Sequence, residues 1–187
     1  MSERMILLDC EATNLVLPAL APDDQQPHLV EVTLLPVAVK TLKPLGKSVT
    51  LRCRPPVPLP GEFTKITGIV QEEVEGLPPF AAILPALTEV MLGTRYLLAH
   101  NVAYDAGVLA LELQRLGRVA QFPWPPERCC TVEATQHFTG QYLSLQNLAL
   151  HLFGQKPEQA HRSQSDVELL HRCCLELKKQ GHFPWGG

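Results

Sequence analysis

The run Met5-Ile6-Leu7-Leu8-Asp9-Cys10-Glu11 begins with four apolar residues and ends with two carboxylates. The segment Met5–Asp9, with its four apolar residues, predicts a buried strand near the start of the chain. Residues two apart on a strand point to the same face, so we expect Asp9 and Glu11 to lie side by side. Exposed acids are common at strand ends, but two neighbouring carboxylates repel each other unless a cation or a proton intervenes.

The chain beyond this strand alternates between apolar strands and helices. Apolar runs predict further strands at Leu29–Val39, Val49–Cys53 and Tyr96–Ala99. Helical spacing predicts two short turns at Phe63–Ile66 and Val70–Val74, and longer helices at Phe80–Met91, Tyr104–Leu116, Leu145–Phe153 and Ser163–Lys179. Loops are expected at Asn14–His28, Pro55–Pro60, Phe122–Pro126 and Gln155–Arg162. Residues 1–187 therefore predict a single α/β domain with a mixed β-sheet flanked by α-helices.

Two of the predicted helices begin with an acid that is aligned with the apolar face. Asp166 is followed at helical spacing by Leu169, Leu170, Cys173 and Leu177. Asp105 is followed in the same way by Val108, Leu109, Leu113 and Leu116. The helix dipole favours an acid in the first turn, but it does not explain why the acid lies on the face that packs against the sheet. We expect both carboxylates to point towards the sheet.

Other polar residues on these helices have local roles in our interpretation. Asn101 is a candidate cap for the middle helix. Ser163 and Ser165 are both candidate caps for the last helix, and Ser165 with Glu168 has the spacing of a capping box. Glu112 falls inside the apolar stripe of the middle helix, and we interpret it as a structural residue that is hydrogen-bonded near the sheet.

One of the seven histidines has a suggestive position. His161 lies five residues before Asp166, at the end of the loop Gln155–Arg162. Free imidazole titrates near neutral pH, which suits a general base for the attack of water. Taken alone, His161 is better explained as an exposed loop histidine, since the chain has seven histidines. His100 follows a predicted strand, and we expect it to make local hydrogen bonds.

Composition and charge exclude several classes of protein. Hydrophobic residues make up 45% of the chain and charged residues 19%, as in an ordinary globular protein. The net charge of −3 argues against broad adhesion to nucleic acid through a basic surface, but leaves room for a small cationic groove. We expect no membrane segment and no signal peptide, because no apolar run reaches bilayer length and Met1–Arg4 lead directly into a strand.

The six cysteines include the adjacent pairs Cys129-Cys130 and Cys173-Cys174. Neither pair has the CxxC spacing of a zinc site. We expect the cysteines to be buried in the core as small apolar residues. Free thiols indicate a reducing compartment, and hence a cytoplasmic location.

Three acidic motifs occur in one order along the chain: Asp9-Cys10-Glu11, His100-Asn101-Val102-Ala103-Tyr104-Asp105, and His161 with Asp166. In this order the chain resembles the DEDDh 3′–5′ exonucleases, a family that includes bacterial proofreading exonucleases and ribonuclease T. Shorter similarities extend the resemblance over nearly the whole chain, at Thr67-Gly68-Ile69, Pro79-Phe80, Glu112–Gly117, Cys130-Thr131 and Leu143–Leu148. The resemblance implies a ribonuclease H-like fold.

The resemblance also implies a hydrolase that works with two Mg²⁺ or Mn²⁺ ions and releases nucleoside 5′-monophosphates. It implies that Asp9, Glu11, Asp105 and Asp166 bind the metals and that His161 is the general base. In this pattern Asp9 contacts both ions, Glu11 and Asp166 hold the first, and Asp105 acts on the second through water. Hard cations prefer carboxylate oxygen and retain several waters, which fits this set of residues.

By the same resemblance, the 3′ end of the substrate lies over the exit of the first strand. The implied contacts are Cys10, Ala12, Thr13, Asn14, Leu15, Gly68, Ile69, His100 and Asn101. The chain departs from the family pattern at Ala12-Thr13-Asn14, where Thr-Thr-Gly is frequent, in the longer stretch Asn14–His28, and at Ser163, which replaces a common alanine. None of these departures removes a catalytic group.

Several functions remain open from the sequence. The first is a self-standing exonuclease on single-stranded DNA or RNA 3′ ends, with DNA somewhat favoured. The alternatives are an exoribonuclease of the ribonuclease T type and a proofreading accessory subunit with a DNA polymerase partner. The chain ends at Gly187, soon after the last predicted helix, which favours the self-standing enzyme. The presence of all five catalytic-type residues argues against a degenerate binding module. The oligomeric state stays open, and Phe122–Pro126 is either a dimer interface or a packed loop.

Overall fold

A mixed sheet forms the centre of the computed structural model, which describes residues 3–157 and 161–186. Its strands are β1 (Arg4–Ala12), β2 (Leu29–Ala38), β3 (Val49–Arg52), β4 (Tyr96–Ala99) and β5 (Glu127–Cys130). The strand order is β3-β2-β1-β4-β5. β1 pairs antiparallel with β2 and parallel with β4, while β2–β3 is antiparallel and β4–β5 is parallel. The predicted mixed sheet is confirmed.

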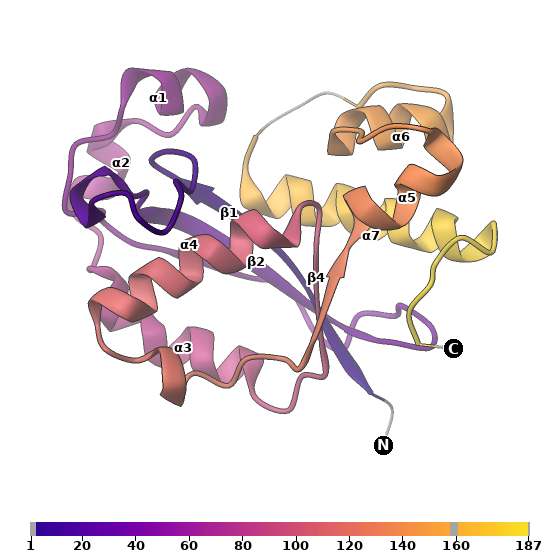
Figure 1. Cartoon of the computed structure of the whole chain (residues 1–187), viewed down its shortest axis with the longest axis horizontal. Helices are drawn as coiled ribbons and strands as arrows, with labels where there is room; N and C mark the ends of the chain where they lie inside the picture. Colours follow the sequence, from indigo (N-terminus) through magenta and orange to yellow (C-terminus); the bar gives the residue numbers. More distant parts are fainter. Residues whose placement is uncertain (1–2, 158–160, 187) are drawn as a thin grey trace.

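Helices cover both faces of this sheet. They are α1 (Gly61–Thr67), α2 (Gln71–Glu75), α3 (Phe80–Met91), α4 (Val102–Arg115), α5 (Thr131–Thr139), α6 (Leu145–Phe153) and α7 (Ser163–Lys179), with 3₁₀ turns at Asp23–Gln25 and Val119–Gln121. Figure 1 shows α3 and α4 on one side of the strands, and α7 with α5 and α6 on the other. α7 packs against β1 and β2. The helix-flanked α/β class is therefore also confirmed.

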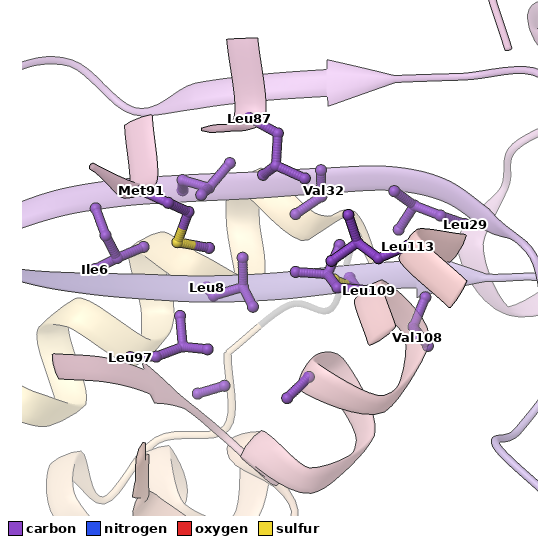
Figure 2. Close-up of a cluster of buried hydrophobic side chains, with 14 of the residues drawn as sticks. Ile6, Leu8, Leu29, Val32, Leu87, Met91, Leu97, Val108, Leu109 and Leu113 are labelled. Atoms are coloured by element: carbon purple, nitrogen blue, oxygen red, sulfur yellow. The ribbon is translucent and has the colours of Figure 1, made fainter. Parts of the chain in front are cut away.

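Alternate side chains of β1 pack into two separate hydrophobic cores, one on each face of the sheet. Ile6 and Leu8 pack into the core beneath α3 and α4, together with residues such as Leu109 (Figure 2). Met5 and Leu7 point the other way, into the core beneath α7. Both faces of the strand are buried, which explains its continuous apolar run. Because side chains alternate strictly, Asp9 and Glu11 continue the row of Met5 and Leu7 and lie on the α7 side.

The long connection from β1 to β2 is held against α4. Glu112 Oε1 accepts a hydrogen bond from the Leu29 amide at 3.0 Å and lies 3.2 Å from His28 Nδ1. Arg115 Nη1 donates to the same Glu112 oxygen at 3.1 Å and to the Pro27 carbonyl at 2.9 Å. The predicted structural role of Glu112, hydrogen-bonded near the sheet, is confirmed.

Some element boundaries differ from the sequence-based prediction. β1 runs to Ala12 rather than Asp9, because β2 continues to pair beside it through a register shift at Glu11/Ala12. α4 begins at Val102 rather than Tyr104. β5 and α5 were not predicted at all. Residues 158–160 of the predicted loop Gln155–Arg162, together with Met1, Ser2 and Gly187, lie outside the described residues.

The predicted helix caps were right in position for Asn101 and wrong for the two serines. Asn101 is the N-cap residue of α4, but it has a left-handed backbone with φ 76°, and its side chain bonds to none of the described amides of the first turn. Arg162, not a serine, precedes α7 as its N-cap. Ser165 Oγ donates to the Arg162 carbonyl at 2.9 Å, so the predicted capping box with Glu168 does not form. The Ser163 hydroxyl is engaged by β2 instead, as described below.

The six cysteines are buried with free thiols, as predicted for small core residues. Within residues 3–157 and 161–186, no helix is both long enough and apolar enough to cross a bilayer.

Candidate active site

Three carboxylates meet where β1 leaves the sheet. β1 extends past Leu7, the last residue that pairs with β4, and carries Asp9 and Glu11 on its α7 side. Asp166 lies in the first turn of α7, which packs across this face. One carboxylate oxygen from each of the three residues lies within 4.8 Å of the other two. The predicted convergence of the first and third motifs is therefore present.

Asp105 reaches the same strand end from the opposite face. It lies in the first turn of α4 and is 2% exposed. Its Oδ1 accepts a hydrogen bond from the Cys10 amide at 2.8 Å. Cys10 lies between Asp9 and Glu11, so the four acids surround a single short segment of backbone.

Burial and mutual repulsion make these acids hard to ionise. Burial raises the pKa of Asp9 well above its usual range, and the charges of Asp105 and Glu11 raise it further. Burial, followed by the charge of Asp166, raises the pKa of Glu11 to about 8. Burial raises the pKa of Asp105 to about 7, although the hydrogen bond from the Cys10 amide works in the opposite direction. A divalent cation at this point would supply the missing counter-charge.

His161 lies at the edge of the acid cluster. Its positive form is near enough to Asp166 to lower the pKa of that carboxyl, against the upward effect of burial. Its backbone is left-handed, with φ 40°. A non-glycine residue in this region costs on the order of 1–3 kcal/mol and persists only where its surroundings hold it. The structure thus brings His161 together with the predicted acids.

The predicted substrate contacts after β1 fall on a rim above the acids. Thr13 is buried, and its Oγ1 accepts from the His28 amide at 2.9 Å. Asn14 is exposed, and its carbonyl accepts from the Tyr104 hydroxyl at 3.2 Å. Leu15 has 69% of its surface exposed. Asn14 and Leu15 therefore present side chains to solvent at the strand exit, whereas Thr13 closes the turn.

Other predicted contacts differ in accessibility. Cys10 and Ala12 are buried in the core beneath α4, and Ile69 is fully buried against α1 and α2. At these three positions, only the backbone is therefore available for the predicted contacts with the substrate. Gly68 is exposed and ends α1 with φ 69°, a left-handed conformation that favours glycine.

His100 and Asn101 border a pocket of about 540 Å³ that also includes Tyr142. The His100 ring bonds to Thr131 Oγ1 at 2.8 Å and to the Leu143 carbonyl at 2.9 Å. Burial lowers the pKa of His100. The local hydrogen-bonding role predicted for His100 is confirmed, and Asn101 is exposed beside it.

A comparison with known families agrees with this geometry. A family model of the RNase T type, described as an exonuclease, matches residues 6–172. The chain belongs to this exonuclease family. Its relatives hydrolyse phosphodiester bonds with divalent metals, and the acidic cluster supplies the carboxylate oxygens that such chemistry requires.

The exonuclease is similar to segments of larger bacterial proteins. It is 35% identical over 69 residues to the PolC-type DNA polymerase III of Clostridium perfringens (strain 13 / Type A), covering 37% of this chain and 5% of that protein. It is 31% identical over 133 residues to the 3′-5′ exonuclease DinG of Bacillus subtilis (strain 168), covering 68% of this chain and 13% of that protein. The chain thus spans a small part of the length of these relatives.

Solved structures share the fold of the exonuclease. The nuclease domain of 3′hExo, a DEDDh family member bound to rAMP, superposes with a TM-score of 0.76 at 19% identity, covering 97% of this chain and 94% of that one. A 3′-exonuclease that recognises the histone mRNA stem-loop gives a TM-score of 0.77 at 18% identity, covering 97% of this chain and 65% of that one. These likenesses confirm the predicted ribonuclease H-like fold.

The exonuclease site includes a buried acid that the sequence-based reasoning missed. Glu31 lies opposite Glu11 in the β1–β2 register and is 4% exposed. Its Oε1 accepts from the amide and the hydroxyl of Ser163, at 3.1 and 2.8 Å. The Ser163 hydroxyl also lies 2.7 Å from Thr33 Oγ1. A single acid inside the apolar run Leu29–Val39 was the available signal, and a serine in place of alanine at position 163 gives Glu31 its second partner.

Proposed function

We propose that this protein is a 3′–5′ exonuclease that hydrolyses phosphodiester bonds at nucleic-acid 3′ ends and releases nucleoside 5′-monophosphates. The observation that carries the proposal is the convergence of Asp9, Glu11 and Asp166, whose carboxylate oxygens lie within 4.8 Å of one another, beside the buried Asp105. We assign this activity to a single domain that spans residues 1–187.

The four acids suit a pair of Mg²⁺ or Mn²⁺ ions. Carboxylate oxygens are the ligands that these cations prefer, and burial and mutual repulsion raise the pKa of Asp9 and Glu11, an effect that a bound cation would offset. In our proposal Asp9, Glu11 and Asp166 would hold metal through their clustered oxygens, and Asp9 with Asp105 would serve a second ion. When bound, such ions favour ionisation of the attacking water and stabilise the leaving oxygen.

His161 is the proposed general base in this scheme. An imidazole nitrogen of His161 accepts the proton of the attacking water and then passes it to solvent. Its position beside Asp166, at the edge of the cluster, supports this role.

We propose that the 3′ end of the substrate binds to the exposed rim around the acids. Asn14 and Leu15 on one side and Gly68 on the other present accessible groups, and Asn101 lies at the head of α4. The backbones of Cys10, Ala12, Thr13 and Ile69, together with His100, complete the proposed contacts.

The related proteins bear on both candidate polymers. The solved neighbours include one bound to rAMP and one that recognises an mRNA stem-loop, which favours an exoribonuclease of the ribonuclease T type as the second candidate. The polymerase relative instead favours DNA, with a polymerase as partner and proofreading as the task. We propose single-stranded 3′ ends as the substrate class and a cytoplasmic location, since six buried free thiols suit a reducing compartment.

One assay tests this proposal. Matched single- and double-stranded DNA and RNA oligonucleotides, labelled at the 5′ end, are incubated with Mg²⁺, with Mn²⁺ or with chelator. We expect a ladder that shortens from the 3′ end, mononucleotide 5′-monophosphate products, and no hydrolysis in chelator. The Asp9→Ala variant is the control for contaminating nucleases. Equal activity of that variant, or no hydrolysis of any of the polymers, would overturn the proposal.

A further inference from the structure

Arg162 links the two sides of the active-site rim. It follows His161 directly and precedes the first turn of α7. Its Nη2 donates to Glu73 Oε1 at 3.3 Å and to Glu73 Oε2 at 3.4 Å. Glu73 belongs to α2, which is far from α7 in the sequence. The contact therefore joins the segment that carries the general base to the segment that follows Thr67–Ile69.

Two further residues extend this contact into a charge network, made of Glu31, Arg52, Glu73 and Arg162. Arg52 Nη2 donates to Glu73 Oε2 at 3.1 Å. Arg52 Nε lies 3.1 Å from Glu31 Oε2, an ion-pair distance without hydrogen-bond alignment. Arg162 Nη1 lies 3.7 Å from the same Glu31 oxygen. Two acids and two arginines thus alternate, and each charge has an opposite neighbour.

The charge network adjoins the strand position of Glu11 and the start of α7. Glu31 pairs in register with Glu11 and binds the Ser163 amide at the start of α7. Asp166 follows in the same helical turn. His161 precedes Arg162 in a left-handed conformation, which is retained only if neighbouring contacts hold it.

We propose that Glu73 and Arg162 are positioning residues whose ion pair holds the segment His161–Asp166 against α2. This inference rests on the exonuclease function proposed above. With the pair intact, His161 and Asp166 keep their working positions while the Thr67–Ile69 segment receives the 3′ end. When the ion pair is broken, the segment His161–Asp166 is no longer held against α2, and the general base leaves its working position.

The exposure of the pair indicates orientation rather than stability as its role. The side chains of Arg162 and Glu73 are 32% and 34% exposed. Ion pairs at such positions add little to the stability of a fold. Small displacements of a catalytic group can nevertheless lower the rate by about a hundredfold. The hydrogen bond from the Val70 amide, together with those from Arg52 and Arg162, lowers the pKa of Glu73, so the acid stays charged at neutral pH.

Four variants separate these roles. Glu73→Gln keeps an acceptor for the Val70 amide but removes the charge, and Glu72→Gln, an exposed acid on the same helix, is the matched control. We expect Glu73→Gln to lower kcat by about ten- to a hundredfold, with a smaller change in KM and a melting temperature close to that of the wild type. Glu72→Gln should match the wild type. Arg162→Lys, which keeps the charge, should retain more activity than Arg162→Gln.

Hydrogen exchange tests the contact independently of activity. We expect the amides from Arg162 to Asp166 to exchange faster in Glu73→Gln than in Glu72→Gln. Equal exchange in the two variants overturns the positioning role, even if the wild-type protein is active. Faster exchange with unchanged kcat overturns it as well. An inactive wild-type protein instead overturns the proposed function, and the inference with it, so the two failures are distinguishable.

Discussion

Asp9 is the residue on which the other acids converge. Burial and the charges of Asp105, Glu11 and Asp166 all raise its pKa, so its carboxylate is ionised in the folded protein only at a cost. A side chain retained at such a cost fits a functional role better than a role in stability.

Asp9→Ala should abolish hydrolysis and leave the fold intact, because the change removes a repelled carboxylate and no core contact. Single-turnover product formation and circular dichroism measure the two parts of this prediction. Full activity of the variant in the single-turnover assay would remove the basis for the metal centre.

His161→Ala should lower the rate far more than the affinity for metal. The imidazole accepts a proton in the proposed reaction but is not among the clustered ligands, so we expect a loss of about 10²–10⁴-fold in turnover. Titration with Mn²⁺ in single-turnover assays separates the two effects. Asp166→Asn is the contrasting variant, since it should weaken metal binding directly. Unchanged turnover of His161→Ala would refute the general-base role.

Among the larger elements, the β1–β2 connection depends on one buried carboxylate. Glu112→Ala should destabilise the protein by about 2–4 kcal/mol, because it leaves the Leu29 amide and the Arg115 guanidinium without their shared acceptor. Urea unfolding measures this loss. Gln114→Ala, an exposed change on the same helix, should unfold close to the wild-type midpoint. Equal midpoints for the two variants would contradict the role of Glu112.

The elements that the sequence predicted well are those with a strong hydrophobic period. β1, β2, α3, α4 and α7 bury continuous or regularly spaced apolar residues, and both faces of the sheet follow from this pattern. β5 and α5 were missed for physical reasons. The strand Glu127–Cys130 is short and lacks alternation, and the helix Thr131–Thr139 has three threonines, which disfavour helices. Their tertiary neighbours decide their conformation.

The convergence of the acids was predictable from the sequence, but the contacts that support it were not. Asp105 and Asp166 could be identified from the sequence because each precedes the apolar face of a helix. The predicted cap at Ser163 failed because a tertiary partner took its hydroxyl, which donates to Glu31 on β2. The pair between Arg162 and Glu73 joins residues 89 positions apart, and no local pattern reveals such a contact.

Over the whole molecule, the acidic centre makes stability depend on pH and metal together. Glu11 has an ordinary pKa of 4.5 and a folded value of about 8, and Asp105 shifts from 3.8 to about 7. For a raised folded pKa, the stabilising effect is complete below the ordinary value and disappears as pH rises through the folded value. The metal-free protein should therefore lose stability between about pH 4.5 and 8.

Mn²⁺ should reverse this trend. Binding requires deprotonated carboxylates, so the metal should stabilise the fold more at pH 8 than at pH 6 and should release protons as it binds. Thermal unfolding across this pH range, and calorimetry in buffers of different ionisation enthalpy, measure both effects. Asp9→Ala should show little metal-dependent stabilisation. A metal-free protein that became more stable from pH 5 to pH 8 would contradict the raised pKa values.

The acids of the cluster enter the chain at widely separated times during translation. Asp9 and Glu11 on β1 are made first, Asp105 on α4 follows, and His161 and Asp166 are made last, at the start of α7. A nascent chain that has reached only α6 lacks His161, Asp166 and the helix that covers this face of β1. Domains generally fold as units during synthesis. The group of three carboxylates therefore cannot assemble on the ribosome before α7 has been made.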